Sequence, residues 1–148
     1  MLETITIYCK NNQVYKEVPI GSSLLDIYQA VGAPLRYRPL NAQVNNKTEG
    51  LGYRCWQSKD VEFVDYTHLS GQRTYVRSLC HILLKATHDI WPEATLYLEH
   101  PVSNGYYCVI RDGRRPDADT IGKIKARMRE LIDANLPFIH RRARTADA

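Results

Sequence analysis

Apolar and polar residues alternate at the start of the chain in the way that is typical of a half-buried β-strand. Ile5, Ile7 and Cys9 share one face of the segment 4–9, and the polar residues between them share the other. An asparagine pair follows, which predicts a hairpin turn, and residues 13–18 predict the return strand. The chain therefore opens with a predicted β-hairpin.

The apolar spacing then changes to three and four residues, which predicts a short helix after about residue 23. Ser22 and Ser23 offer hydroxyls that can cap its first turn, and Gly32 with Pro34 predicts its end. Two more strands are predicted over 40–44 and 61–66. The order strand, strand, helix, strand, strand predicts a β-grasp, or ubiquitin-like, domain over residues 1–67.

A second domain is predicted over residues 68–148, after a joint at 69–71. It opens with a long helix over 72–90 and continues with a hairpin whose strands cover 95–100 and 106–110. A last helix is predicted to follow, capped by Asp119 or Thr120, and residues 144–148 predict the beginning of another helix. The predicted fold class is α+β: a β-grasp domain followed by a partial α+β domain.

Composition narrows the class of protein. No run of about 18 apolar residues is present, so we expect no membrane span, and the first residues do not resemble a signal peptide. The four cysteines lie 25 or more residues apart, without any Cys-x-x-Cys pair. That spacing favours four reduced thiols in a cytoplasmic protein over a zinc site or a disulfide framework.

The net charge of +4 is unevenly distributed. Residues 1–110 contain ten basic and ten acidic side chains, whereas residues 111–148 contain ten basic and six acidic ones. A basic surface attracts phosphates, although a basic helix face is also commonly just solvated. The anion- or RNA-binding residues predicted from the sequence are Arg77, Arg111, Arg114, Arg115, Arg141 and Arg142.

One face of the predicted long helix combines cations and histidines. Arg77, His81, Lys85 and His88 recur at intervals of four, four and three, which places them on one side of a helix. Arg77 can grip a phosphate or carboxylate through two parallel hydrogen bonds, or it can pair with an acid such as Glu99. A lone His81 is more typical of a structural histidine than of a base or metal ligand.

Two stretches resemble threonyl-tRNA synthetases. Residues 18–27 and 40–45 resemble the TGS domain at the start of these enzymes, and residues 78–84, 90–94 and 101–107 resemble the editing-type domain that follows it. The resemblance implies two histidines four apart on the long helix and a Cys-x-x-x-His pair further along. Arg77 occupies the first histidine position, and only His81 remains.

This departure predicts a degenerate pocket at Arg77 and His81, with no catalytic residue and no metal ligand, because a guanidinium cannot ligate a metal. The implied second pair would fall beyond residue 148. We therefore expect an incomplete second domain with an exposed apolar face, some self-association and a homodimer as one form.

Arginine at position 77 and the segments 73–80 and 99–101 look more like bacterial uridine-kinase-like nucleoside kinases that carry these two domains. The first hypothesis is therefore a non-catalytic binding or regulatory module that binds RNA, such as tRNA, or a nucleotide. The implied parent is a kinase with its kinase domain in cis, using ATP and Mg²⁺. No cofactor is predicted for the 148 residues, which contain no P-loop motif.

Two alternatives remain open. The first is an N-terminal fragment of a threonyl-tRNA synthetase, or a deacylase that clears mischarged tRNA in trans. The second is a protein-interaction module built on the β-grasp sheet. Binding to tRNA that weakens steeply with salt would favour the RNA hypotheses over the interaction module.

Overall fold

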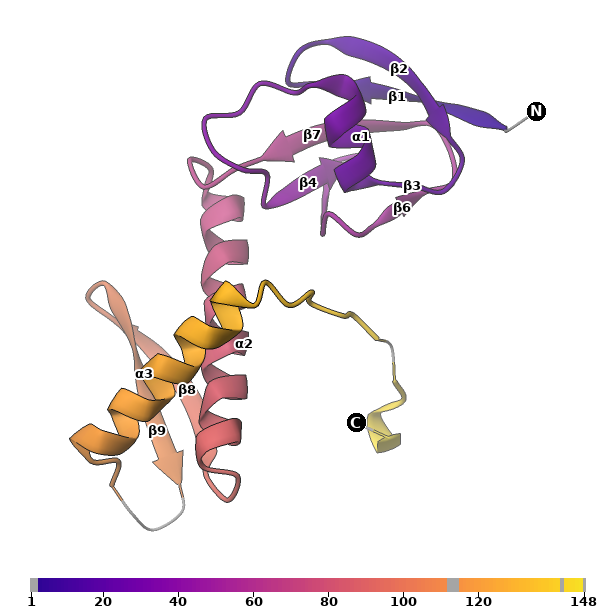
Figure 1. The fold of residues 1–148 in the computed structure, drawn as a ribbon. Coiled ribbons are helices and arrows are strands. Elements are labelled where there is room, and N and C mark those ends of the chain that lie inside the picture. Colours follow the sequence, from indigo (N-terminus) through magenta and orange to yellow (C-terminus); the bar gives the residue numbers. More distant parts are fainter. Residues whose placement is uncertain (1–2, 112–114, 142, 148) are drawn as a thin grey trace. The chain divides into compact units, whose positions relative to one another are not determined.

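The computed structural model describes residues 3–111, 115–141 and 143–147, and the chain divides into two compact units, Met1–Ser78 and Leu79–Ala148 (Figure 1). The fold class is α+β, as predicted. The strands are β1 (Thr4–Cys9), β2 (Val14–Pro19), β3 (Ser22–Ser23), β4 (Asn41–Val44), β5 (Lys47–Glu49), β6 (Arg54–Cys55), β7 (Lys59–Val64), β8 (Thr95–Val102) and β9 (Gly105–Arg111). The helices are α1 (Leu24–Val31), α2 (Leu69–Ile90) and α3 (Ala118–Asp133), and a 3-10 turn covers Thr145–Asp147.

The first unit is built on a mixed sheet with the strand order β2-β1-β7-β4-β5. β1 pairs with β2 in antiparallel register and with β7 in parallel register, and β4 is antiparallel to both β7 and β5. The small strands β3 and β6 form a separate pair. The central strand, β7, and its neighbour β1 are therefore brought together from distant parts of the unit's sequence.

α1 lies across one face of this sheet (Figure 1) and closes the core. Ser23 caps the helix in a capping box with Asp26: the Ser23 hydroxyl accepts from the Asp26 amide at 3.2 Å, and the Asp26 carboxylate accepts from the Ser23 amide at 3.1 Å. Gly32 ends the helix in a left-handed conformation, with φ of 61°. The core that these elements enclose contains Ile5, Ile7, Cys9, Val18, Leu24, Ile27, Val31, Ala33, Ala42, Val44, Cys55, Val61 and Phe63.

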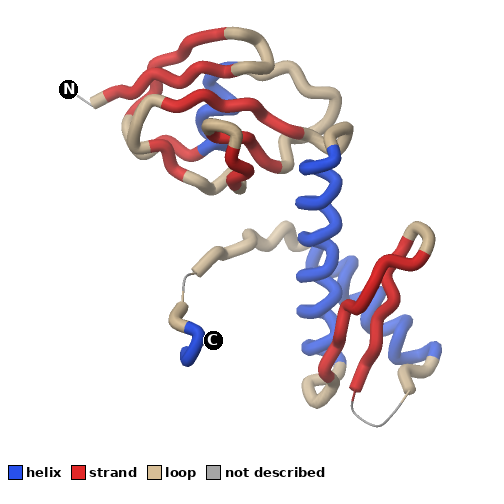
Figure 2. Tube along the Cα trace, turned by 180° about the vertical axis from the view of Figure 1, so that it is seen from behind, coloured by secondary structure: helices blue, strands red, loops and turns tan. Residues whose placement is uncertain are grey.

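The second unit contains most of α2, the β8–β9 hairpin and α3, with the hairpin on one side of the helices (Figure 2). Its buried core is small: Ala86, Ile124 and Leu131, with Leu83 and Met128 partly buried beside them. The pairing of β8 and β9 is irregular between Leu98 and Pro101. Proline has no N–H to donate, which accounts for the break in the ladder at that place.

Several predicted boundaries shift. The joint expected at 69–71 is helical, because α2 begins at Leu69. α3 is capped by Asp117, whose side chain accepts from the Thr120 amide at 2.7 Å, so the predicted caps Asp119 and Thr120 were wrong. Strand β7 begins two residues earlier than predicted and ends at Val64, and the short strands β3, β5 and β6 were missed.

No helix among the described residues is long and apolar enough to cross a membrane. Cys9 and Cys55 are buried, Cys80 and Cys108 are partly exposed, and all four are free thiols. Burial raises the pKa of the Cys55 thiol, so this side chain behaves as an apolar member of the core.

Candidate anion-binding surfaces

Arg77, His81, Lys85 and His88 all lie on α2, as predicted, but their side chains have different neighbours. Arg77 is exposed and makes no ion pair within the described ranges. The His81 ring lies 6.4 Å from the Phe138 ring, centroid to centroid, in an edge-to-face arrangement. Lys85 instead pairs with Asp89 one turn later. Among these side chains Arg77 is therefore the cation left available to an external anion.

The described part of the chain holds no group of three or more His, Cys, Asp and Glu side chains that could bind a metal ion. Burial raises the pKa of the Cys108 thiol, and the neighbouring Cys80 raises it further. The Cys108 thiol therefore remains protonated at neutral pH and is not a ready nucleophile or metal ligand. Within the described ranges the contact recorded for the His81 ring is with Phe138, which is not the partner that a hydrolytic pair needs.

The predicted arginines of the last quarter of the chain lie at two separate places. Arg111 lies 4.6 Å from the centre of the Tyr97 ring, and Arg115 lies just before α3, whereas Arg141 lies beyond the other end of that helix. A helix of 16 residues is about 24 Å long, so these arginines belong to two places. Arg114 and Arg142 lie outside the described residues.

Part of the positive charge of α3 is internally paired. Arg127 donates to Asp89 of α2 at 3.0 Å and to Glu130 at 2.8 Å, and Lys123 pairs with Asp119. Hydrogen bonds from Lys85 of the same helix and, second, from Arg127 lower the pKa of Asp89. These ion pairs, of which Arg127–Asp89 joins α3 to α2, neutralise part of the positive charge of the last quarter of the chain.

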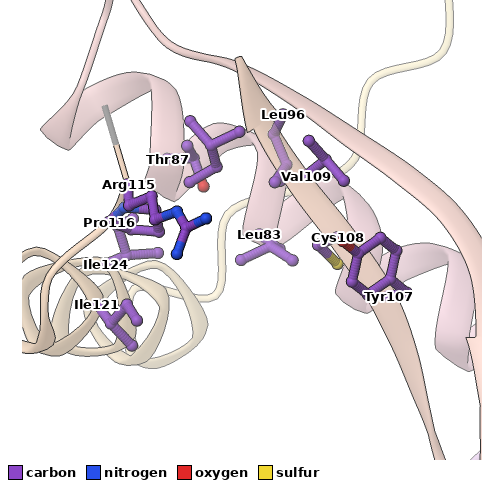
Figure 3. A pocket seen from close by; sticks show the side chains of 11 residues that line it. Leu83, Thr87, Leu96, Tyr107, Cys108, Val109, Arg115, Pro116, Ile121 and Ile124 are labelled. Atoms are coloured by element: carbon purple, nitrogen blue, oxygen red, sulfur yellow. The ribbon is translucent and has the colours of Figure 1, made fainter. Parts of the chain in front are cut away.

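A cavity of about 580 Å³ lies between α2, the hairpin and the start of α3 (Figure 3). Its walls are mostly apolar, and Arg115 reaches in from one side. Thr87 lines it as well; this residue is 2% exposed, and its hydroxyl has no hydrogen-bond partner within the described structure. The lining residues are Leu83, Thr87, Leu96, Tyr107, Cys108, Val109, Ile110, Arg115, Pro116, Ile121 and Ile124.

Sequence reasoning missed a junction in the first unit that is organised by Asp65. This carboxylate accepts from the backbone amides of Arg36 and Tyr37, each at 3.0 Å, and from the amide and hydroxyl of Thr67 at 2.8 and 2.5 Å. Asn41 is also buried beside this junction; its amide nitrogen donates to Ser70 and Thr74 of α2. The junction fixes the loop before β4 against the first turns of α2.

The Asp65 carboxylate should make the first unit sensitive to acid. The Thr67 hydroxyl, followed by the amides of Tyr37, Thr67 and Arg36, lowers its pKa from 3.8 to about 2. A lowered folded-state pKa stabilises the fold above the unfolded-state value and loses that contribution as pH falls. We therefore expect the melting temperature of the wild type to drop between pH about 4 and about 2.

Thermal melts of wild type and Asp65→Asn across this range test the expectation. The variant should be less stable at neutral pH, because an amide has one oxygen to accept from four donors, and its stability should change less between pH about 4 and about 2. Asp133→Asn, at an exposed position on α3, serves as a control. Parallel pH curves for wild type and Asp65→Asn would contradict the assignment.

The fold and these surfaces define an α+β chain of two compact units, with exposed arginines and no metal-binding cluster among the described residues. No protein-family model matches the chain. It is similar to curated threonine–tRNA ligases: 23% identical over 85% of this chain for Syntrophomonas wolfei, 25% over 90% for Desulforamulus reducens and 26% over 90% for Protochlamydia amoebophila. The chain spans about a fifth of the length of these relatives.

Proposed function

We propose that the chain is the N-terminal region of a threonyl-tRNA-synthetase-like protein and that it binds tRNA without hydrolysing it. Similarity over 85–90% of the chain to threonine–tRNA ligases supports the first part. This proposal replaces the kinase hypothesis as the leading one, because no finding favours a kinase domain in cis. Four free thiols are in keeping with a reducing, cytoplasmic location.

The domain assignments are part of the proposal. A β-grasp domain over residues 1–67 is supported by the element order and by the parallel pairing of β1 with β7, with α1 on one face of the sheet. A partial editing-type domain over 68–148 is supported by a long helix followed by a hairpin and a second helix. The boundary itself stays a prediction.

The observation that carries the binding function is Arg77. Its guanidinium is exposed on α2, four residues before His81, and no acid pairs with it in the described part of the chain. No acidic residue occurs between Asp65 and Asp89. A permanently charged, two-pronged donor in such surroundings suits a phosphate. The same role is proposed for Arg111, Arg114, Arg115, Arg141 and Arg142.

Binding of a threonine tRNA transcript, followed by fluorescence anisotropy at several salt concentrations, tests the proposal. We expect binding that weakens steeply with salt, and we expect Arg77→Ala to weaken it several-fold and to reduce the salt slope by about one. Arg129→Ala is the matched control, since Arg129 is an exposed arginine on α3 outside the proposed set. No tRNA binding even at low salt would favour the protein-interaction module.

Deacylation of seryl-tRNA separates binding from catalysis. We expect no hydrolysis above the uncatalysed rate, because the described residues place a phenylalanine ring, and no second base, beside His81. Turnover that disappears in His81→Ala would overturn this part and would establish the deacylase alternative.

A nucleoside-kinase parent, with ATP and Mg²⁺ in its own domain, stays a second candidate because of arginine at position 77. The reading frame beyond codon 148 decides between the two. A class II synthetase core there supports the leading proposal, and a P-loop kinase domain supports the second candidate.

A further inference from the structure

A second exposed surface, on the first unit, combines arginines with tyrosine rings. It comprises Arg36, Tyr37 and Arg38 from the loop before β4, Tyr66 from the connection between β7 and α2, and Tyr75 from the second turn of α2. We call it the tyrosine–arginine surface. None of these residues belongs to the arginine set proposed above for tRNA, so the inference is independent of that function.

Asp65 brings the two segments together. Its carboxylate accepts from the backbone amides of Arg36 and Tyr37, and its own backbone continues directly into Tyr66. The rings of Tyr66 and Tyr75 then meet edge to face, with centroids 5.2 Å apart. The Asp65 residue thus links the loop that carries Tyr37 to the segment that carries the Tyr66–Tyr75 pair.

The rings of this surface are available to a ligand. Tyr37 is 51% exposed, and Tyr66 and Tyr75 are each 44% exposed. The Arg36 guanidinium carbon lies 5.4 Å from the centre of the Tyr37 ring, so a cation is already placed beside an aromatic face. The loop is restrained by Pro34, Pro39 and the bonds to Asp65, which lowers the entropy lost when a ligand binds.

Arg36 and Arg38 also give this surface positive charge. No acidic residue occurs between Asp26 and Glu49 or between Asp65 and Asp89, so no carboxylate near these segments in sequence offsets Arg36 and Arg38 except Asp65. The oxygens of Asp65 accept four hydrogen bonds from loop and turn groups. Within the described ranges, Arg36 and Arg38 form no ion pair.

The same unit contains a contrasting tyrosine pair. Tyr8 and Tyr15 stack with centroids 4.7 Å apart on the face of the sheet that also carries Glu17 and Asp60, the register partners of Thr6 and Tyr8. Aromatic exposure is therefore not peculiar to the tyrosine–arginine surface. Its combination with unneutralised arginines is what distinguishes that surface.

We propose that the tyrosine–arginine surface binds single-stranded RNA, with bases stacking on the tyrosine rings and Arg36 and Arg38 contacting the phosphates. Stacking accepts any base, because every base has a π-face, and the arginines track a backbone that is negatively charged throughout. A duplex keeps its bases stacked inside and offers only phosphates. Preference for the single strand is therefore the property that this surface predicts.

The test uses the full 148-residue chain and a fluorescein-labelled oligouridylate of about ten nucleotides, followed by fluorescence anisotropy. An RNA duplex of the same length is the comparison. We expect the single strand to bind more tightly than the duplex. The double variant Arg36→Ala/Arg38→Ala should raise Kd by about tenfold or more at low salt, because two phosphate contacts are lost.

Tyr37→Ala should raise Kd by roughly fivefold or more, whereas Tyr37→Phe, which keeps the ring, should bind like the wild type. Tyr15→Ala/Lys16→Ala removes an exposed tyrosine and a cation from β2 and should leave Kd within about twofold. Circular dichroism confirms that each variant is folded.

Three outcomes would overturn the inference. The first is no binding of the oligouridylate at low salt, and the second is a rise in Kd for Tyr15→Ala/Lys16→Ala equal to that for Arg36→Ala/Arg38→Ala. The third is binding of the duplex as tight as that of the single strand. Loss of oligouridylate binding in Arg36→Ala/Arg38→Ala, together with unchanged binding in Arg77→Ala, separates this surface from the tRNA contact proposed above. If the oligouridylate does not bind, the proposal that Arg77 binds tRNA is still tested separately by the experiment with the tRNA transcript.

Discussion

Replacing Gly71 by alanine is expected to destabilise the first unit strongly, because this glycine is buried against the backbone of Asp65. A methyl group there would lie inside the van der Waals shell of the Asp65 carbonyl oxygen and 2.7 Å from its carbonyl carbon. The obstacle is backbone, so it cannot rotate away as a side chain can. The start of α2 would have to move and give up the hydrogen bonds that Asn41 donates to Ser70 and Thr74.

We expect a loss of about 3 kcal/mol or more from Gly71→Ala. Urea unfolding, with amide hydrogen exchange of peptides from residues 3–66 measured separately, reports the effect on the first unit. Gly122→Ala is the matched control: its added methyl would meet nothing within 4 Å, and alanine in the interior of α3 should stabilise that helix by up to about 1 kcal/mol. Equal stability of the two variants would contradict the packing described at Asp65.

Phe63→Ala is expected to have the second large effect, a loss of about 3–5 kcal/mol. Phe63 is buried in β7, and its ring meets Tyr28 of α1 edge to face at 5.2 Å between centroids. The Asn11 side chain holds the Phe63 backbone from both sides, accepting from its amide at 2.7 Å and donating to its carbonyl at 2.9 Å. The strand therefore cannot collapse into the space that the ring leaves.

The chain supplies its own control for this prediction. Phe138 is the other phenylalanine, and it is mostly exposed. Phe138→Ala should change the free energy of unfolding by less than about 0.5 kcal/mol. Denaturation midpoints in urea compare the two variants, and similar midpoints would show that Phe63 does not carry the core.

The elements that could be predicted from sequence are those whose determinants are local. The cap at Ser23, the acid at Asp26 and the stop at Gly32 lie within ten residues, and the structure places all three as predicted. The alternation of Ile5 and Ile7 likewise gave β1 its bounds and its buried face. Such signals come from residues that are close in sequence, so they can be recognised without knowledge of the fold.

The errors occur where several local signals compete or where the cause is distant. Asp117, Asp119 and Thr120 can all cap a helix, and the sequence prediction named the second and third of them, whereas Asp117 is the cap. Gly71 suggested a joint, yet in the structure this glycine allows α2 to approach Asp65. The role of Asp65 itself was invisible, because its loop donors, Arg36 and Tyr37, lie 29 and 28 residues away.

The candidate sites show the same difference between features that are local in sequence and contacts between residues far apart in sequence. The exposed arginine on α2 and the absence of acids around it were readable from the sequence. The pairing of Arg127 with Asp89 was not, because 38 residues separate them, and it removes charge from the surface expected for RNA. The tyrosine–arginine surface could have been suspected from the Arg-Tyr-Arg triplet at 36–38, but only the Asp65 bonds place it beside Tyr66.

The parallel pairing of β1 with β7 also sets the order in which the first unit can assemble. Ile7 faces Lys59 in that register, so the sheet cannot gain its central pair until a loop of more than fifty residues has closed. The β1–β2 hairpin and α1 are local and can form quickly, but alone they lack the strand that completes their core. During synthesis, the first unit should therefore stay open until β7 has left the ribosome and should then close in a single cooperative step.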